Sequence, residues 1–290
     1  MTRQNTRLGV WLMIATAFVF AMQDGISRHL AGEYNVFMVI MIRFWFFGAF
    51  VLALASRQSG GIRAAARTRR PLTQVARGVI LVTEIMVMVA AFTILGLTES
   101  HAVFAVYPLL VAALSGPILG ERVGWRRWTA IGIGFAGVVV ILQPGSGVFR
   151  AAALIPLAAA AMFALYGLLT RHVSRDDPSA VSFFWAGVIG AALSTVVGVW
   201  FWEPMVPADW LWMALLCLTA AFSHWLLIKA YEVAEASAIQ PFAYLQLPFA
   251  SAIGIALFGE TLRVNVAVGA AIVVCAGLFT LWRARVKGQG

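Results

Sequence analysis

The stretch Leu119-Gly120-Glu121-Arg122 closes a long apolar run, and a similar stretch, Phe258-Gly259-Glu260-Thr261, closes another 139 residues later. Each run holds a proline near its middle, Pro108 or Pro248. Each run also begins beside a Glu that is followed by small residues, Glu99 or Glu235, 136 residues apart. Such self-similarity at a fixed offset indicates a duplicated structural unit.

A third match lies upstream, where Ile26-Ser27-Arg28-His29 and Leu169-Thr170-Arg171-His172 end two apolar runs 143 residues apart. The duplication therefore extends over nearly the whole chain of 290 residues. We expect two units, residues 1–145 and 146–290. The helix-breaking run Gln143-Pro144-Gly145-Ser146-Gly147 is the expected boundary between them.

The composition places the chain in a membrane. Hydrophobic residues make up 62% and charged residues 11%, which is too little polar surface to cover a water-soluble globule of this size. The net charge of +9 does not indicate nucleic-acid binding here, because the basic residues fall in short loops between apolar spans. We expect the lipid bilayer to be the chain's surroundings and no nucleic acid among its partners.

A bilayer core of about 30 Å needs roughly 20 helical residues, and ten apolar runs approach that length. They cover residues 8–30, 35–55, 74–97, 101–119, 126–143, 151–171, 179–201, 208–230, 236–258 and 264–282. The predicted fold is an all-α membrane protein with ten transmembrane helices, five in each unit. An odd number of spans per unit inverts the second unit in the membrane, as in many secondary transporters.

The basic residues predict the orientation. With the N-terminus placed in the cytoplasm, 17 of the 21 Lys and Arg residues fall on the inner side, three fall outside, and Arg43 lies within a span. Positive residues are enriched on the cytoplasmic side of membrane proteins. We therefore expect both termini in the cytoplasm and the chain in the inner membrane of a bacterium.

Charged side chains within the spans are the first candidates for function, because such groups are costly in hydrocarbon. Arg43 and Glu84 are predicted near the midplane, as a structural ion pair or as a cavity pair that meets substrate or a proton. Asp24 is expected to pair with Arg28, four residues later on the same helix face.

Polar and aromatic groups within the spans extend this set. Tyr107 and Gln246 stand beside the two prolines, where the helix bends and a carbonyl is freed. With Tyr244, they are predicted to face the substrate between the fourth and ninth spans. His101 suits either an access path or interfacial solvation. The remaining candidates for substrate binding are Tyr166, Trp185 and His224.

Several chemistries find no support in the sequence. It contains no glycine-rich phosphate loop, no Cys or His cluster with metal spacing and no serine nucleophile in an elbow context. We expect no cofactor, no metal and no enzymatic activity. Transport would then draw on a gradient of substrate or ion.

Glycines in the fifth and tenth spans permit close helix contact. Gly132, Gly134 and Gly137 lie in the fifth, and Gly269 and Gly277 in the tenth. They favour packing within the chain over a dimer contact, and the oligomeric state, monomer or dimer, stays open.

The chain resembles the drug/metabolite transporter superfamily, and within it the EamA-type ten-helix proteins. The resemblance rests on Leu119–Val123 and Phe258–Leu262 after proline-containing spans, on Arg77-Gly78 opening the third span, and on Arg43-Phe44 in the second. It implies a central cavity built from spans 1–4 and 6–9, with spans 5 and 10 at the periphery. Members include the YddG-like amino-acid exporters, which the chain resembles in length and topology.

The leading hypothesis is a secondary transporter that exports amino acids or related small metabolites by alternating access. Arg43 and Glu84, of opposite sign, would suit a zwitterion. The first alternative is an importer of a vitamin such as riboflavin or of another metabolite. The second, from a different class, is a membrane scaffold subunit that transports nothing.

Overall fold

The computed structural model describes residues 5–58, 60–120, 124–142, 151–234, 239 and 242–288. Within these ranges the chain forms helices and loops and no strand. The helices of the first half are α1 (Thr6–Glu33), α2 (Val36–Arg57), α3 (Gly61–Ala66), α4 (Pro71–Leu95), α5 (Leu97–Phe104), α6 (Tyr107–Leu119) and α7 (Trp125–Leu142). Those of the second half are η1 (Ala151–Ala153), α8 (Leu154–Val173), α9 (Ser179–Gly198), η2 (Val199–Phe201), α10 (Asp209–Val233), α12 (Gln246–Phe258) and α13 (Val264–Gly288).

Seven helical segments of the described chain are long and apolar enough to cross a bilayer. They are Thr6–Glu33, Val36–Arg57, Pro71–Leu95, Leu97–Leu119, Ala151–Val173, Ser179–Phe201 and Asp209–Val233. The other three expected spans contain shorter apolar helices, Trp128–Ile141, Gln246–Phe258 and Val264–Phe279. The all-helical membrane fold is thus confirmed, whereas the full set of ten spans stays a prediction.

Several expected features lie outside the described residues. They are the boundary at 143–147, Glu121 and Arg122 of the first Gly-Glu motif, and the stretch 235–238. The two motif glycines are described. Gly120 (φ 75°) and Gly259 (φ 63°) both adopt the left-handed conformation that ends a helix, α6 and α12 respectively. The Gly-Glu motifs therefore mark helix ends, as expected.

The fourth span is interrupted. It starts at Leu97, earlier than expected, directly after Gly96, which has a φ of 82°. Between α5 and α6 the helix breaks at Ala105 and Val106, ahead of Pro108 in the first turn of α6. Proline has no N–H to donate to the preceding turn, so the break lies where its ring stops the helix from continuing backwards. The expected bend near Pro108 is confirmed and is a full interruption.

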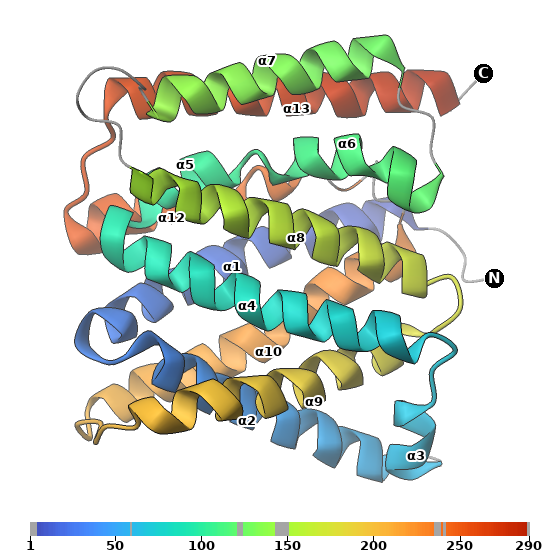
Figure 1. Cartoon of the computed structure of the whole chain (residues 1–290), viewed down its shortest axis with the longest axis vertical. Coiled ribbons are helices and arrows are strands. Elements are labelled where there is room, and N and C mark those ends of the chain that lie inside the picture. Colours follow the sequence, from blue (N-terminus) through green and yellow to red (C-terminus); the bar gives the residue numbers. More distant parts are fainter. Residues whose placement is uncertain are drawn as a thin grey trace.

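The most extensive helix contacts join the two halves. They are α7 with α13, α1 with α10, α2 with α9, and α4 with α8 (Figure 1). By their order in the chain, the counterparts of α1, α2, α4, α6 and α7 in the second half are α8, α9, α10, α12 and α13. Exchanging each helix for its counterpart turns the α1–α10 contact into the α8–α4 contact. It also turns the α6–α8 contact into the α12–α1 contact. The α7–α13 and α2–α9 pairs map onto themselves. This is the contact pattern of two related halves that interlock.

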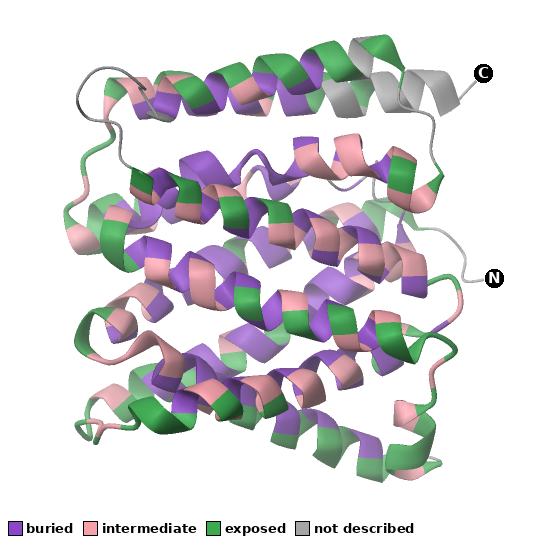
Figure 2. Ribbon diagram, viewed as in Figure 1, coloured by how far each residue is buried: buried purple, intermediate pink, exposed green. Residues whose placement is uncertain are grey.

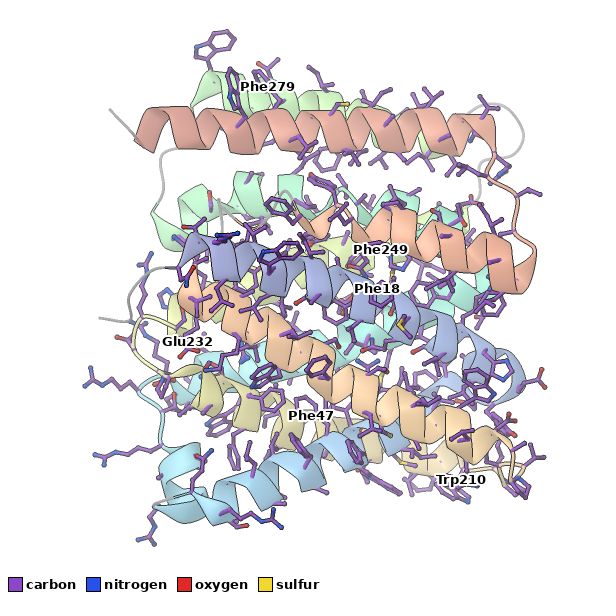
Figure 3. All side chains as sticks on the ribbon, turned by 180° about the vertical axis from the view of Figure 1, so that it is seen from behind. Phe18, Phe47, Trp210, Glu232, Phe249 and Phe279 are labelled. Atoms are coloured by element: carbon purple, nitrogen blue, oxygen red, sulfur yellow. The ribbon has the colours of Figure 1, made fainter. Side chains whose placement is uncertain are left out.

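Burial follows the same arrangement. Buried residues face the interior of the bundle, while exposed residues run along the outer faces of the helices (Figure 2). Many of those exposed residues are large and apolar, among them Trp11, Phe50 and Leu257. Across the seam between halves, the rings of Phe18 (α1) and Phe249 (α12) meet edge to face at 5.4 Å (Figure 3). An apolar exterior of this extent is the surface that a lipid bilayer would cover.

Helices α7 and α13 lie together at one edge of the molecule (Figure 1). A Cβ built on Gly137 would lie 2.8 Å from the carbonyl oxygen of Gly269, and one on Gly269 would lie 2.5 Å from that of Gly137. The absence of side chains is thus what allows the two backbones to touch. Packing within the chain, the preferred explanation for these glycines, is confirmed for this pair.

We expect Gly137→Ala to lower the stability of the protein, because the new methyl group would push the α13 backbone away. Overpacking of this kind costs about 1–3 kcal/mol. Gly132→Ala, on the same helix but with open space around the added methyl, is the matched control. Thermal unfolding in detergent should show a lower midpoint for Gly137→Ala alone. Equal midpoints for the two variants would contradict the close contact.

Candidate substrate cavity

A cavity lies inside the bundle, between helices of both halves. Its volume is about 40 Å³, which holds a few water molecules at about 10–15 Å³ each. Helices α1, α2, α4 and α5 contribute from the first half, and α8, α10 and α12 from the second. Its polar lining consists of Gln23, Asp24, Arg43, Glu84, His101, His224 and Gln246. A substrate of more than a few atoms would need the cavity to widen.

Asp24 lies at the centre of one group of contacts. Nε2 of Gln246 donates a hydrogen bond of 3.1 Å to Oδ2 of Asp24. Nε2 of His101 lies 3.1 Å from the same oxygen, although the two are not aligned for a hydrogen bond. The expected pair of Asp24 with Arg28 is wrong, because Arg28 contacts Glu260 instead. Asp24 is therefore free to face the cavity.

Arg43 and Glu84 line the same cavity without pairing directly. The guanidinium of Arg43 lies 3.4 Å from Nε2 of His224. Across the described part of the chain, the carboxyl of Glu84 takes part in no hydrogen bond and no ion pair within 4 Å. The predicted ion pair is therefore not formed. The alternative prediction, a pair of groups in a cavity, describes their placement better, because both groups face one shared space.

Aromatic rings form the apolar part of the lining, with Phe20, Phe92, Phe104 and Phe163 around the polar groups. The ring of His101 stacks on Phe92, with centroids 5.3 Å apart. The ring of His224 packs edge to face on Phe20 at 5.3 Å. It also stacks on Phe47, labelled in Figure 3, at 6.3 Å. Both histidines are thus held in fixed orientations by apolar neighbours.

The sequence-predicted residues divide into two groups. Arg43, Glu84, His101, His224 and Gln246 line the cavity. The other four candidates, Tyr107, Tyr166, Trp185 and Tyr244, lie outside its lining.

Each of these four has other contacts. Tyr107 packs on Phe163 at 5.0 Å, and the ring of Tyr166 lies 5.1 Å from the guanidinium of Arg77. Trp185 donates a hydrogen bond of 3.2 Å to the carbonyl of Ala66. The hydroxyl of Tyr244 presses against Gly277 of α13. A role for them in substrate binding stays a prediction.

Sequence reasoning left two lining features out of the site. Asp24 was assigned to an ion pair with Arg28, and the phenylalanines were not considered. A charged residue in an apolar run was the available signal for Asp24. No signal distinguished these four rings from the other sixteen of the 20 phenylalanines, because only the fold gathers them from α1, α4, α5 and α8.

At one end of the bundle, a carboxylate of the second half holds the start of a helix of the first. Glu260 accepts hydrogen bonds of 2.8 Å from the backbone N–H groups of Leu97 and Thr98, the first residues of α5. It also forms an ion pair with Arg28. Free amides at a helix N-terminus favour an anion. We call Glu260, Arg28, Leu97 and Thr98 the Glu260 cluster.

Burial by itself would raise the pKa of the Glu260 carboxyl. The hydrogen bonds from Thr98 and Leu97, together with the charge of Arg28, outweigh burial and hold that pKa below its ordinary value. A second ion pair, between Arg263 and Glu99, ties the same two segments. At neutral pH, charged contacts therefore hold the two halves together at this end of the bundle.

The opposite end has a similar arrangement. Asp177, in the loop between α8 and α9, accepts a hydrogen bond of 3.1 Å from the backbone N–H of Arg69 and one of 3.0 Å from Nε2 of Gln74. The hydroxyl of Thr68 donates to it as well. We call these four residues the Asp177 cluster. Burial tends to raise the pKa of Asp177, but these hydrogen bonds lower it overall.

Arg77 extends the Asp177 cluster inwards. It is fully buried and donates a hydrogen bond of 2.9 Å to Oε1 of Gln74 and one of 3.0 Å to Oγ1 of Thr170. It also reaches the carbonyl of Ser182 in α9. Each nitrogen of the guanidinium thus finds an acceptor, as a buried charge requires. Helix α4 is thereby tied to both α8 and α9.

Comparison with known proteins identifies relatives of the chain. The model of the EamA-like transporter family matches the chain twice, at residues 7–143 and 150–282. A solved crystal structure aligns with a TM-score of 0.65 over 97% of both chains at 20% identity, so the two share a fold.

Curated relatives align over nearly their whole length. The S-adenosylmethionine uptake transporter of Rickettsia prowazekii is 26% identical, over 94% of this chain and 92% of that relative. The riboflavin transporter of Vibrio cholerae is 26% identical, over 96% and 94%. That of Rhizobium johnstonii is 28% identical, over 94% and 91%. The expected likeness to amino-acid exporters finds no support in these names. With the family model matching both halves, the chain belongs to the EamA-like transporter family.

Proposed function

We propose that this transporter imports a small heterocyclic metabolite into the bacterial cell by alternating access, with the cavity of Asp24, Arg43 and Glu84 as its binding site. The observation that carries the proposal is a polar cavity built by both halves, with polar contacts between the halves towards both ends of the bundle. Charged groups inside a membrane protein commonly mark a substrate path. A scaffold subunit has no need of them, and the family relationship makes the chain a transporter.

The proposed architecture is ten spans in two inverted five-helix repeats, 1–145 and 146–290. Two observations support it: the contact pattern that is unchanged when the halves are exchanged, and the family model that matches twice. Inverted repeats place substrate between the halves and let one rock against the other. With both termini cytoplasmic, the Asp177 cluster would close the inner end and the Glu260 cluster the outer end.

The direction and substrate are inferred from the relatives' names. Their names give uptake of S-adenosylmethionine and transport of riboflavin as their activities. Import of a metabolite, the alternative reading of the sequence, therefore replaces amino-acid export as our main proposal. Both named molecules carry a flat nitrogen heterocycle, which the phenylalanine rings of the cavity would contact by stacking.

Reconstituted vesicles test the function directly. We expect time-dependent uptake of labelled S-adenosylmethionine or riboflavin without ATP, above that of vesicles lacking the protein. Excess unlabelled compound should compete. A panel of amino acids serves as the comparison. Uptake of amino acids alone, or of nothing in the panel, would contradict the proposal.

We expect Glu260→Gln to open the outer end. Hydrogen bonds to charged groups contribute about 1.5–3 kcal/mol, and 1.4 kcal/mol is a tenfold change in an equilibrium. A cysteine at Ser100, fully buried in α5, should react about tenfold faster with an impermeant maleimide. Cys217 and Cys275 are replaced by Ser in this background. Glu33→Gln, an exposed residue at the same end, is the control and should leave the rate unchanged.

The pH dependence of the same labelling has a defined sign. Because the folded-state pKa of Glu260 is lowered, its contribution is present above the ordinary carboxyl pKa of about 4.3 and is lost only as the pH falls through the lowered value. Accessibility of the cysteine, corrected for maleimide chemistry, should therefore stay constant between about pH 6 and 7.5. A rate that changes through this range, or one that Glu260→Gln does not alter, would show that Glu260 does not close this end.

A further inference from the structure

The charges that line the cavity do not balance. Arg43 contributes one positive charge, while Asp24 and Glu84 contribute two negative charges, and the histidines are counted as neutral. Asp24 has Gln246 as a hydrogen-bond donor and His101 as a close neighbour, and Arg43 has His224. Glu84 alone has no polar partner in the described part of the chain. When all three groups are ionised, the excess negative charge resides at Glu84.

An unpaired carboxylate in a closed space is unfavourable. The effective penalty for burying an ion in a protein is several kcal/mol, even after relaxation and entry of water. Glu84 is only 5% exposed, and the cavity admits a few water molecules. A proton bound to Glu84, or a positive group that entered the cavity, would offset this penalty, whereas a neutral ligand would leave it in place. The lining of the cavity thus favours a cation as its occupant.

The apolar lining favours the same kind of occupant. The rings of Phe20, Phe92, Phe104 and Phe163 surround the space that Glu84 faces. A cation near the face of an aromatic ring is attracted by its quadrupole, and more strongly where water is excluded. Aromatic faces also accept a flat heterocycle. Once the cavity has widened, an acidic group and a set of rings in its lining would therefore complement an organic cation that carries a ring.

We propose that the substrate is an α-amino acid zwitterion with one additional positive charge, and that Glu84 contacts that additional charge. This inference rests on the proposed function. Arg43 would bind the carboxylate of the zwitterion and Asp24 its ammonium group. The three charges of the lining thus match three charges of opposite sign on the ligand. S-adenosylmethionine, with its sulfonium centre, has this pattern and a heterocycle, whereas riboflavin has neither a zwitterion nor a sulfonium.

The test compares two ligands that differ at one centre. S-adenosylhomocysteine lacks the methyl group and the positive charge of the sulfonium and is otherwise the same molecule as S-adenosylmethionine. Binding of both is measured with the purified protein in detergent, by competition against labelled S-adenosylmethionine and by direct calorimetry. We expect the native protein to bind S-adenosylmethionine at least tenfold more tightly. Lysine, which has the same charge pattern without a heterocycle, should bind more weakly than S-adenosylmethionine.

Glu84→Gln keeps the shape of the side chain and leaves Arg43 balanced by Asp24. We expect it to abolish the preference for S-adenosylmethionine. The affinity for S-adenosylmethionine should fall at least tenfold, while the affinity for S-adenosylhomocysteine should stay unchanged. Glu84→Asp, which keeps the charge, should retain most of the preference. Thermal unfolding of both variants checks that the fold is intact. Glu84→Asp also keeps the proposal testable if Glu84→Gln fails to fold.

The remaining outcomes are distinguishable. If Glu84→Gln lowered the affinity for both ligands equally, Glu84 would have a structural role and the inference would be overturned. An unchanged preference with a lost pH dependence of transport would make Glu84 a proton site instead, which also overturns it. If riboflavin is transported and the sulfonium compound is not, the proposed function holds and the inference fails. If none of these compounds is bound or transported, both fail.

Discussion

The cavity depends on how α5, the first helix of the broken fourth span, begins. Helix α5 starts directly after Gly96, and its first N–H groups have no acceptor within the helix. Leu97 and Thr98 are buried, and buried backbone groups must find partners within the protein. Glu260 supplies those partners from the other half of the chain. Because α5 carries His101 one turn further on, this contact also fixes one wall of the cavity.

The two ends of the molecule join the halves by the same kind of contact. In the Glu260 cluster and in the Asp177 cluster, an acidic side chain from a loop of the second half binds backbone N–H groups of the first half. Both carboxyls have lowered pKa values, because donors around them outweigh burial. Such hydrogen bonds to a charged group are strong when formed, and they break completely when the two segments separate. They are suited to a molecule that opens one end at a time.

Sequence patterns predicted the parts of the fold that depend on hydrophobicity and backbone chemistry. Apolar runs located the helices, Pro108 located a break, and Gly120 and Gly259 located helix ends. The close approach at Gly137 and Gly269 also followed from residue size. The orientation of the termini and the limits of the two repeats are predictions that the helix arrangement alone does not decide.

Pairing of charges across the fold was less predictable. Arg28 was assigned to Asp24 because they are four residues apart on one helix, but its partner, Glu260, lies 232 residues away in the chain. Arg43 and Glu84 were correctly singled out as intramembrane charges, yet their separation depends on how α2 and α4 are placed by α9. Local spacing predicts contacts within a helix, whereas contacts between helices follow from packing.

The central claim is that one cavity is reached from the two sides of the membrane in turn. A cysteine at Met88, in the cavity wall contributed by α4, would report this in a background without Cys217 and Cys275. Labelling with an impermeant maleimide is measured in right-side-out and in inside-out vesicles. Alternating access predicts labelling from both sides, slowed on both by a transported substrate. Labelling from one side only, whatever the substrate, would contradict the account.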